Sequence, residues 1–258
     1  MNPLATLGRV FIDFLGGIGR IAMFAGTAIA HGSRPPFYPR QVALQMLDIG
    51  FFSLPVVGLT ALFTGMVLAL QSYTGFARFQ AESAIATVVV LSVTRELGPV
   101  IAGLMVAGRI GASMAAEIGT MRVTEQIDAL STLATNPFKY LVAPRLIAGL
   151  AMMPLLVIVA DVIGVLGGYL VAVYKLGFNP AAYLKRTMDY LEFMDVVSGL
   201  LKAGVFGFLI ALMGCFHGYS SAGGAQGVGR ATTNAVVSAS ILILVADYML
   251  TEIFFATR

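Results

Sequence analysis

The charged pair Arg95-Glu96 stands in the middle of a long apolar stretch and is followed at once by Leu97-Gly98-Pro99. Charges at bilayer depth are costly, so they usually face a bundle interior or a watery cavity and find partners there. Adjacent helical residues point about 100° apart, so Arg95 and Glu96 are not expected to pair with each other. Pro99 has no N–H and leaves the carbonyl of Arg95 without its helical donor. The motif indicates either a polar cavity within a bundle or a buried ion pair that holds helices in register.

Three further charges, Asp161, Lys202 and Asp247, lie singly in apolar segments. Either they anchor one another across helices or they belong to a proton path. The segments Gly164-x-x-x-Gly168 and Gly103-x-x-x-Ala107 are typical of helix packing faces, because small residues let two backbones approach closely.

The sequence offers no catalytic constellation. The phosphate-binding pattern Gly-x-x-x-x-Gly-Lys-Ser/Thr does not occur, so the chain is not expected to bind ATP through such a loop. Gly224, Gly227 and Gly229 predict a flexible loop, since no strand pattern precedes them and no acidic residue follows. The two His residues are far apart and the single Cys cannot form an internal disulfide, so no metal site is predicted.

Residues 124–136 predict a short amphipathic helix. Thr124 is a suitable N-cap, and the acidic residues that follow it suit the positive end of the helix dipole. An apolar stripe runs through Ile127, Leu130 and Ala134, and Asn136-Pro137 ends the helix. A helix outside the membrane between two spans is suited to dock into a separate motor protein, and an idle surface helix is the alternative.

The amino-acid composition indicates the class of protein in which these motifs occur. Of 258 residues, 58% are hydrophobic and only 11% are charged, with a mean hydropathy of +0.89, whereas a soluble domain carries about 25% charged residues. This excludes an ordinary soluble enzyme, a disordered chain and a nucleic-acid binder. The 29 Gly, 13 Met and absence of Trp fit helices packed in lipid. The chain is therefore predicted to be an all-α integral membrane protein.

A bilayer core needs about 20 apolar residues in a helix. We expect a single domain over residues 1–258 with five transmembrane helices, at 45–77, 83–108, 146–174, 196–216 and 231–255. Outside the spans, eight Lys and Arg fall on the side of the N-terminus and five on the other side. This bias places the N-terminus in the cytoplasm and the C-terminus outside.

Residues 4–30 differ from the spans. Arg9, Asp13 and Arg20 form one narrow polar stripe on an otherwise apolar helix, which predicts an interfacial helix with its stripe toward the headgroups. A signal peptide ending at Ala28-Ile29-Ala30 and a sixth span are the alternatives. The prolines between residues 31 and 40 predict an elbow into the first span.

The charged motif and the cytoplasmic stretch resemble the MlaE/YrbE family of lipid ABC permeases. The resemblance covers nearly the whole chain and is carried by Arg95-Glu96-Leu97-Gly98-Pro99-Val100, Ala107-Gly108-Arg109-Ile110-Gly111-Ala112, the run from Ala116 to Leu130, Phe216-His217-Gly218-Tyr219 and Gly229-Arg230-Ala231-Thr232-Thr233.

The resemblance implies a homodimeric permease in the inner membrane of a diderm bacterium, within a system that moves phospholipid between the inner and outer membranes. The implied partners are an ATPase dimer that binds ATP and magnesium, a STAS-domain protein and a periplasmic hexamer of MCE domains. No cofactor is implied in this chain itself.

The resemblance also implies site residues. A phospholipid cavity between spans one and two would be lined by Leu68, Gly75, Phe76, Phe79, Arg95, Glu96 and Leu97. A coupling helix in the ATPase groove would present Glu125, Gln126, Ile127, Asp128 and Leu130. The apolar members suit acyl chains, while Arg95 could attract a phosphate. The rival hypothesis is a self-sufficient proton-coupled transporter that uses the carboxylates of Glu96, Asp161 and Asp247.

Overall fold

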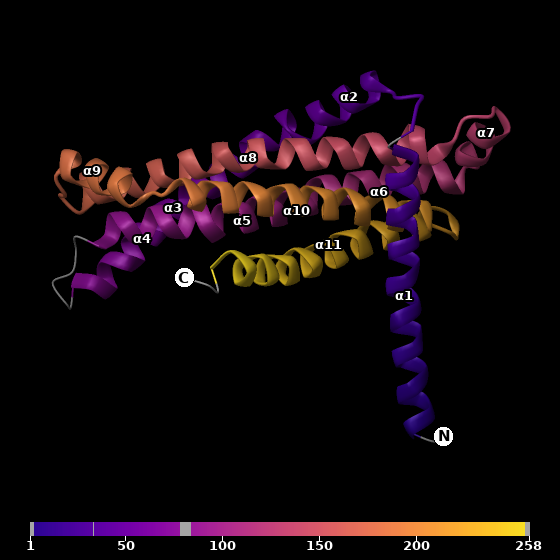
Figure 1. Ribbon diagram of the computed structural model, residues 1–258, viewed down its shortest axis with the longest axis horizontal. Coiled ribbons are helices and arrows are strands. Elements are labelled where there is room, and N and C mark those ends of the chain that lie inside the picture. Colours follow the sequence, from indigo (N-terminus) through magenta and orange to yellow (C-terminus); the bar gives the residue numbers. More distant parts are fainter. Residues whose placement is uncertain (1–2, 33, 78–83, 256–258) are drawn as a thin grey trace.

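The computed structural model describes residues 3–32, 34–77 and 84–255, and every regular element in these ranges is a helix. Long helices run side by side in one bundle, and α1 (Pro3–Gly32) lies crosswise to them and projects away (Figure 1). The prediction of an all-helical membrane protein is confirmed.

The bundle is built from five long helical stretches, several of them divided by short changes of helix type. In chain order these are α2 (Pro39–Ile49), η1 (Phe51–Ser53) and α3 (Leu54–Phe76); α4 (Ile85–Ser92), η4 (Val93–Leu97), α5 (Gly98–Val106), η5 (Ala107–Gly111) and α6 (Ala112–Val123); η6 (Phe138–Val142), α8 (Ala143–Leu170) and η7 (Val171–Lys175); α10 (Phe193–Tyr219); and α11 (Gly224–Phe255). Two short helices lie outside these stretches: α7 (Gln126–Thr132) and α9 (Pro180–Tyr190).

The second stretch continues well past residue 108, where the sequence predicted its end. Arg109 was expected to mark a boundary, yet it lies inside the continuous helix, in the π-helical turn η5. Its guanidinium donates to Ser53 Oγ at 2.8 Å and to the carbonyl of Asp48 at 3.2 Å. Because these contacts stabilise the guanidinium, the helix continues through Arg109.

The third stretch begins at Phe138, eight residues before the expected start at 146. Arg145 is only 3% exposed, and its guanidinium lies 2.8 Å from a carboxylate oxygen of Glu117 on α6. The pairing allows this charge to lie within the bundle. The first expected span, 45–77, is instead two helices: α2 ends at Ile49, and α3 begins at Leu54 with Pro55 in its first turn.

Two short segments also differ from expectation. Gly224 to Gly229 form the first turns of α11, not a loop. The sequence analysis did not identify α9, although Asn179-Pro180 is a helix start, and Asn179 Oδ1 accepts from the backbone N–H groups of Ala181 and Ala182. Tyr183 of α9 is buried, which raises the pKa of its hydroxyl to about 12.

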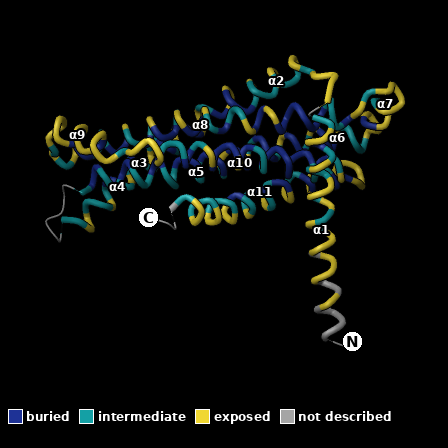
Figure 2. Tube along the Cα trace, in the orientation of Figure 1, coloured by how far each residue is buried: buried dark blue, intermediate teal, exposed yellow. Residues whose placement is uncertain are grey.

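In the described residues, six helices are long and apolar enough to cross a membrane by length and composition. Five of them overlap the five expected spans, and the sixth is Phe11–Gly32 of α1. The middle of the bundle is buried, whereas α1 is exposed along most of its length (Figure 2). The interfacial placement of residues 4–30 stays a prediction, and the crosswise direction of α1 favours it.

Glycines let the central helices approach one another. A Cβ on Gly65 of α3 would clash with the carbonyl of Gly164 on α8, and one on Gly207 of α10 would clash with the carbonyl of Gly149 on α8. A Cβ on Gly168 would lie 2.7 Å from Val89 of α4. The small-residue face predicted at Gly164 and Gly168 is therefore a packing face, and α8 lies at the centre of the bundle.

Candidate functional site

The charged motif lies in η4, a π-helical turn between α4 and α5. Pro99 in the first turn of α5 provides no N–H for the carbonyl of Arg95. The ammonium of Lys202 on α10 donates to that carbonyl at 3.1 Å. The predicted irregularity is confirmed, and it takes the form of a π-turn, which is frequent at functional sites.

Lys202 is the centre of an ionic cluster, and its side chain is fully buried. Its Nζ lies 2.7 Å from Glu96 Oε2 and 3.0 Å from Asp247 Oδ1 on α11. It also donates to Thr251 Oγ at 2.7 Å. One ammonium therefore joins η4, α10 and α11, and it partners both charges of opposite sign that lie near it.

Arg95 turns to a different partner on α10. Its Nη2 and Nε lie 2.7 Å and 2.8 Å from Asp195 Oδ1, and Asp195 is fully buried. The other oxygen of Asp195 accepts from the backbone N–H of Glu192 at 3.1 Å, as part of a capping box that starts α10. Arg95 and Glu96 do not pair with each other, as the sequence predicted, and each is fixed to α10.

The cluster is not sealed from its surroundings. The side chains of Arg95 and Glu96 remain 31% and 37% exposed, although their partners on α10 are fully buried. Two cations and three carboxylates, including Asp247, leave a formal charge of −1. The ion pairs therefore hold the helices together, while the side chains of Arg95 and Glu96 remain accessible to a ligand.

Asp161 of α8 does not join this cluster. It is 8% exposed, and its Oδ1 has no hydrogen-bond partner among the described residues. It lies against Gly98, where a Cβ would clash with the carboxylate. The idea that the three single charges anchor one another therefore holds for Lys202 and Asp247 and fails for Asp161.

The apolar residues of the predicted cavity lie on another side of η4. Leu68 and Phe76 of α3 are half-buried and pack against a cluster that contains Ile85, Val89 and Val93. Gly75 is exposed, with open space where a side chain would be. Leu68 and Phe76 therefore lie where α3, the end of the first stretch, packs against α4, the start of the second. Phe79 lies outside the described residues.

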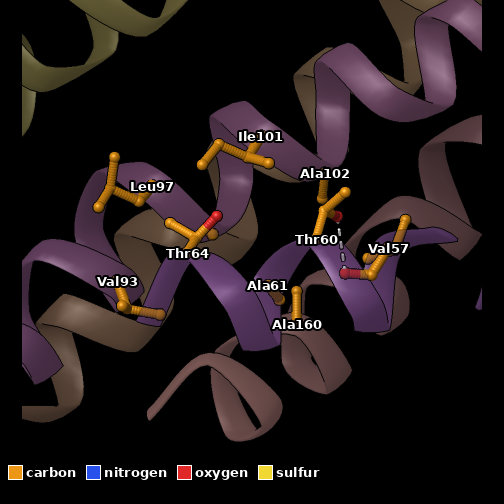
Figure 3. Close-up of a pocket in the computed structure, with 10 residues that line it drawn as sticks. Val57, Thr60, Ala61, Thr64, Val93, Leu97, Ile101, Ala102 and Ala160 are labelled. Carbon is orange, nitrogen blue, oxygen red and sulfur yellow. Dashed lines mark hydrogen bonds between the residues drawn. The ribbon is translucent and has the colours of Figure 1, made fainter. Parts of the chain in front are cut away.

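Leu97 belongs to the same turn, η4, as Arg95 and Glu96, but its neighbours are mostly apolar. It lines a small apolar pocket between α3 and the start of α5, together with Thr64 and Val93. Figure 3 shows Leu97 beside Thr64, with Ala160 of α8 on another side of the pocket. The described members of the predicted set therefore have two kinds of neighbour. Leu68 and Phe76 pack against a cluster that contains Val93, and Leu97 lines a pocket with the same Val93. Arg95 and Glu96 instead pair with side chains of α10.

The predicted coupling residues lie at one end of the bundle, on and before α7 (Figure 1). Glu125 has a φ of 60° and is the N-cap, so the helix begins at Gln126, later than the predicted start at 124. It ends at Thr132 before Ala134, whose φ of 58° is also left-handed, and does not reach 136. Neither residue can continue a right-handed helix.

The faces of α7 are distinct. Ile127 is 1% exposed and Leu130 is half-buried against the main core. Asp128 is exposed and pairs with Arg122 of α6 at 2.8 Å, and Gln126 and Glu125 are exposed. The helix is therefore held by its apolar stripe and presents polar and acidic groups at the bundle end.

Two functional candidates escaped the sequence analysis: Asp195 and Thr251. Asp195 follows Glu192 by three residues, a capping-box spacing just before an apolar run. Thr251 follows Asp247 by four residues and therefore shares its helix face. Both spacings are present in the sequence. The partners of Asp195 and Thr251, which are Arg95 and Lys202, lie about 100 and about 50 residues away and could not be predicted.

Comparison with known proteins identifies relatives along the whole chain. The family described as Permease MlaE matches residues 42–253. A Rickettsia felis protein named "Probable ABC transporter permease protein" is 61% identical over 255 residues, covering 99% of this chain and 98% of that one. The Haemophilus influenzae "Intermembrane phospholipid transport system permease protein MlaE" is 37% identical over 257 residues, covering 99% and 98%. The Arabidopsis thaliana "Protein TRIGALACTOSYLDIACYLGLYCEROL 1, chloroplastic" is 36% identical over 237 residues, covering 91% and 67%.

Proposed function

The chain belongs to the MlaE permease family, and on that premise we propose that it is the permease subunit of an ABC-type phospholipid transporter. It moves phospholipid between the inner and outer membranes of a diderm bacterium and so maintains the lipid asymmetry of the outer membrane. The name of the Haemophilus influenzae relative, which is 37% identical over nearly the full length of both chains, supports the substrate class.

One observation carries the proposal: a single π-turn presents apolar residues on one side and two partly exposed charges on another. Leu97 lines a pocket with Val93, against which Leu68 and Phe76 of α3 also pack. Arg95 and Glu96 remain about a third exposed beside α10. A phospholipid has the same two-part chemistry. Acyl chains contact Leu68, Gly75, Phe76, Phe79 and Leu97, and the headgroup lies by Arg95, with Glu96 limiting how tightly the phosphate is held.

The permease works as a homodimer in the bacterial inner membrane. Exposed apolar side chains on α3 and α11, among them Leu59, Phe63, Ile241 and Tyr248, give each copy a large surface for lipid or for a second copy. The N-terminus lies in the cytoplasm and the C-terminus in the periplasm. With the bundle upright in the bilayer, the crosswise α1 lies along the cytoplasmic interface (Figure 1).

Energy comes from a separate ATPase dimer, which binds ATP and magnesium, and this chain needs no cofactor of its own. The α7 helix docks into the ATPase, with Glu125, Gln126 and Asp128 exposed for contact and with Ile127 and Leu130 holding the helix to the bundle. A STAS-domain protein and a periplasmic MCE hexamer complete the assembly.

The rival, a self-sufficient proton-coupled transporter, would need carboxylates that are free to exchange protons. Lys202 Nζ lies within 3.0 Å of a carboxylate oxygen of both Glu96 and Asp247, so both carboxylates are held in ion pairs. Asp161 does not join this cluster, and its Oδ1 has no hydrogen-bond partner among the described residues. This geometry favours the ABC permease.

Affinity purification in mild detergent through a tag on this chain tests the proposal. We expect an ATPase subunit, a STAS-domain protein, an MCE-domain protein and phospholipid to co-purify, with two copies of this chain per complex by native mass spectrometry. A chain that purifies alone from its native cells, without any ATPase, would overturn the proposal.

A further inference from the structure

Two cavities that the transport site does not use adjoin each other where α1 meets the bundle. One has a volume of about 300 Å³ and lies between the end of α1, the elbow, α2 and the start of α8. The other, of about 260 Å³, lies between α1, α8 and α10. They share Gly32, Ala143 and Ile147. We call the two adjoining cavities the elbow groove; the residues that line it include Gly32, Val42, Met46, Ala143, Ile147 and Leu150.

The groove runs along α8 into the apolar part of the bundle. From Ala143 to Leu150 is seven residues, or about 10 Å of helix. Figure 1 shows α1 reaching the bundle near the start of α8, with the elbow leading from there to α2. Ile147 and Leu150 are 43% and 51% exposed. An apolar trough of this length, open to the side, has the chemistry of a site for an acyl chain.

The mouth of the groove is basic. Lys139 and His31 line the wider cavity. Arg34 is exposed on the elbow, and Arg40 is exposed in the first turn of α2, directly after Pro39 of the cavity lining. Lys139 Nζ donates to the carbonyl of Pro35 at 2.7 Å, which fixes the ammonium at the mouth and uses one of its three N–H donors.

No acidic residue offsets these charges nearby in the sequence. Residues 14–47 and 129–160, which supply α1 beyond its first turns, the elbow, most of α2, η6 and most of α8, contain neither Asp nor Glu. Asp48, at the far end of α2, lies near Arg109. A cationic mouth above an apolar trough is complementary to a lipid with a net negative headgroup.

We propose that the elbow groove binds an anionic phospholipid from the adjoining leaflet, with one acyl chain along Ala143 to Leu150 and its phosphate beside Lys139 and Arg40. The site is distinct from the transport site at η4. Under the proposed orientation the leaflet is the cytoplasmic one, and no other part of the inference rests on the proposed function. The lipid bridges α1 and α8 and so holds the crosswise helix at the membrane surface.

The test uses the full chain in lipid nanodiscs that contain either phosphatidylglycerol or phosphatidylcholine, each with a photoreactive group on an acyl chain. Mass spectrometry then locates the labelled peptides. We expect peptides that cover residues 143–150 to be labelled more by phosphatidylglycerol than by phosphatidylcholine. Each basic residue near an anionic surface contributes about fivefold to lipid binding, so Lys139→Glu together with Arg40→Glu should remove the preference.

The matched control is Lys185→Glu, which reverses an exposed cation on α9 at the other end of the bundle, and it should leave the preference unchanged. Ile147→Trp fills the junction of the two cavities and should reduce labelling by both lipids. Inorganic phosphate should not compete, because the acyl chain is part of the ligand.

Equal labelling of residues 143–150 by the two lipids in the unmutated chain would overturn the proposal without reference to any variant. A preference that survives the double charge reversal would overturn it as well. Loss of lipid transport with the labelling pattern intact would count against the proposed function and leave the groove site standing.

Discussion

The ammonium of Lys202 donates a 3.1 Å hydrogen bond to the backbone carbonyl of Arg95, the carbonyl that Pro99 leaves without a helical donor. The same ammonium lies 2.7 Å from the carboxylate of Glu96. One side chain therefore provides both the donor that the Arg95 carbonyl lacks and the counter-charge of the Glu96 carboxylate. These contacts join the irregular turn η4 to α10.

Lys202→Met should strongly destabilise the protein. The substitution keeps a similar volume but leaves Glu96 and Asp247 without their cation, and breaking a buried ion pair in this way costs about 3–5 kcal/mol. The thermal-unfolding midpoint in detergent is the measurement. Adding Glu96→Gln and Asp247→Asn to the variant removes the stranded charges and should recover part of the loss. A single variant as stable as the unmutated chain would show that the cluster does not hold the helices together.

Glu96→Gln should have a small structural effect and a larger functional one. The amide oxygen can still accept from Lys202, and Asp247 still neutralises that ammonium at 3.0 Å. The carboxylate is 37% exposed, so its removal changes the surface offered to a lipid headgroup. The midpoint of unfolding is compared with the phospholipid that co-purifies per dimer. If stability falls sharply while lipid content and transport stay unchanged, Glu96 serves structure alone.

Leu68→Arg should deplete co-purified phospholipid more than Leu68→Ala does. Leu68 is half-buried between α3 and α4 beside Phe76, so a charged side chain there would oppose acyl chains, whereas alanine only removes contacts. Val67→Arg is the matched control, because Val67 is the preceding residue of α3 and is 61% exposed. Phospholipid is measured by mass spectrometry of the purified dimer. Equal depletion by the Val67 and Leu68 variants would contradict the assigned position of the lipid.

Glu125→Lys together with Asp128→Lys should separate the permease from its ATPase while membrane insertion survives. Reversed charges at a helix N-terminus oppose the dipole by about 0.3–1 kcal/mol each, and Asp128→Lys also loses the pair with Arg122. The ATPase that co-purifies is quantified. Asp189→Lys, on exposed α9, is the control and should keep the ATPase. Normal ATPase recovery with the double variant would remove α7 from the coupling role.

Features that depend on neighbouring residues could be predicted from the sequence, whereas contacts between residues far apart in the chain could not. The irregularity at Pro99 and the packing of Gly164 and Gly168 follow from neighbouring residues, and both are found in the structure. The partners of Arg95 and Glu96 lie about 100 residues away on α10, and periodicity carries no information on that pairing.

The helices extend beyond the expected spans for a related reason. Arg109 and Arg145 were treated as signs that the apolar stretch ends, because a lone charge is costly in a bilayer. Each is satisfied by a group from another helix, at Ser53 and Glu117, and both helices continue. By contrast, α9 was predictable, since Asn179-Pro180 is a local helix start.

The most direct test of the account is phospholipid transfer by the complex purified through this chain. The complex is reconstituted in liposomes with a fluorescent phospholipid, and transfer is followed with ATP, with a non-hydrolysable ATP analogue, and with a proton gradient alone. We expect transfer with ATP only, and neither transfer nor ATP hydrolysis by this chain without its partners. Transfer driven by the proton gradient in the isolated chain, or a complete complex that hydrolyses ATP without moving lipid, would contradict it.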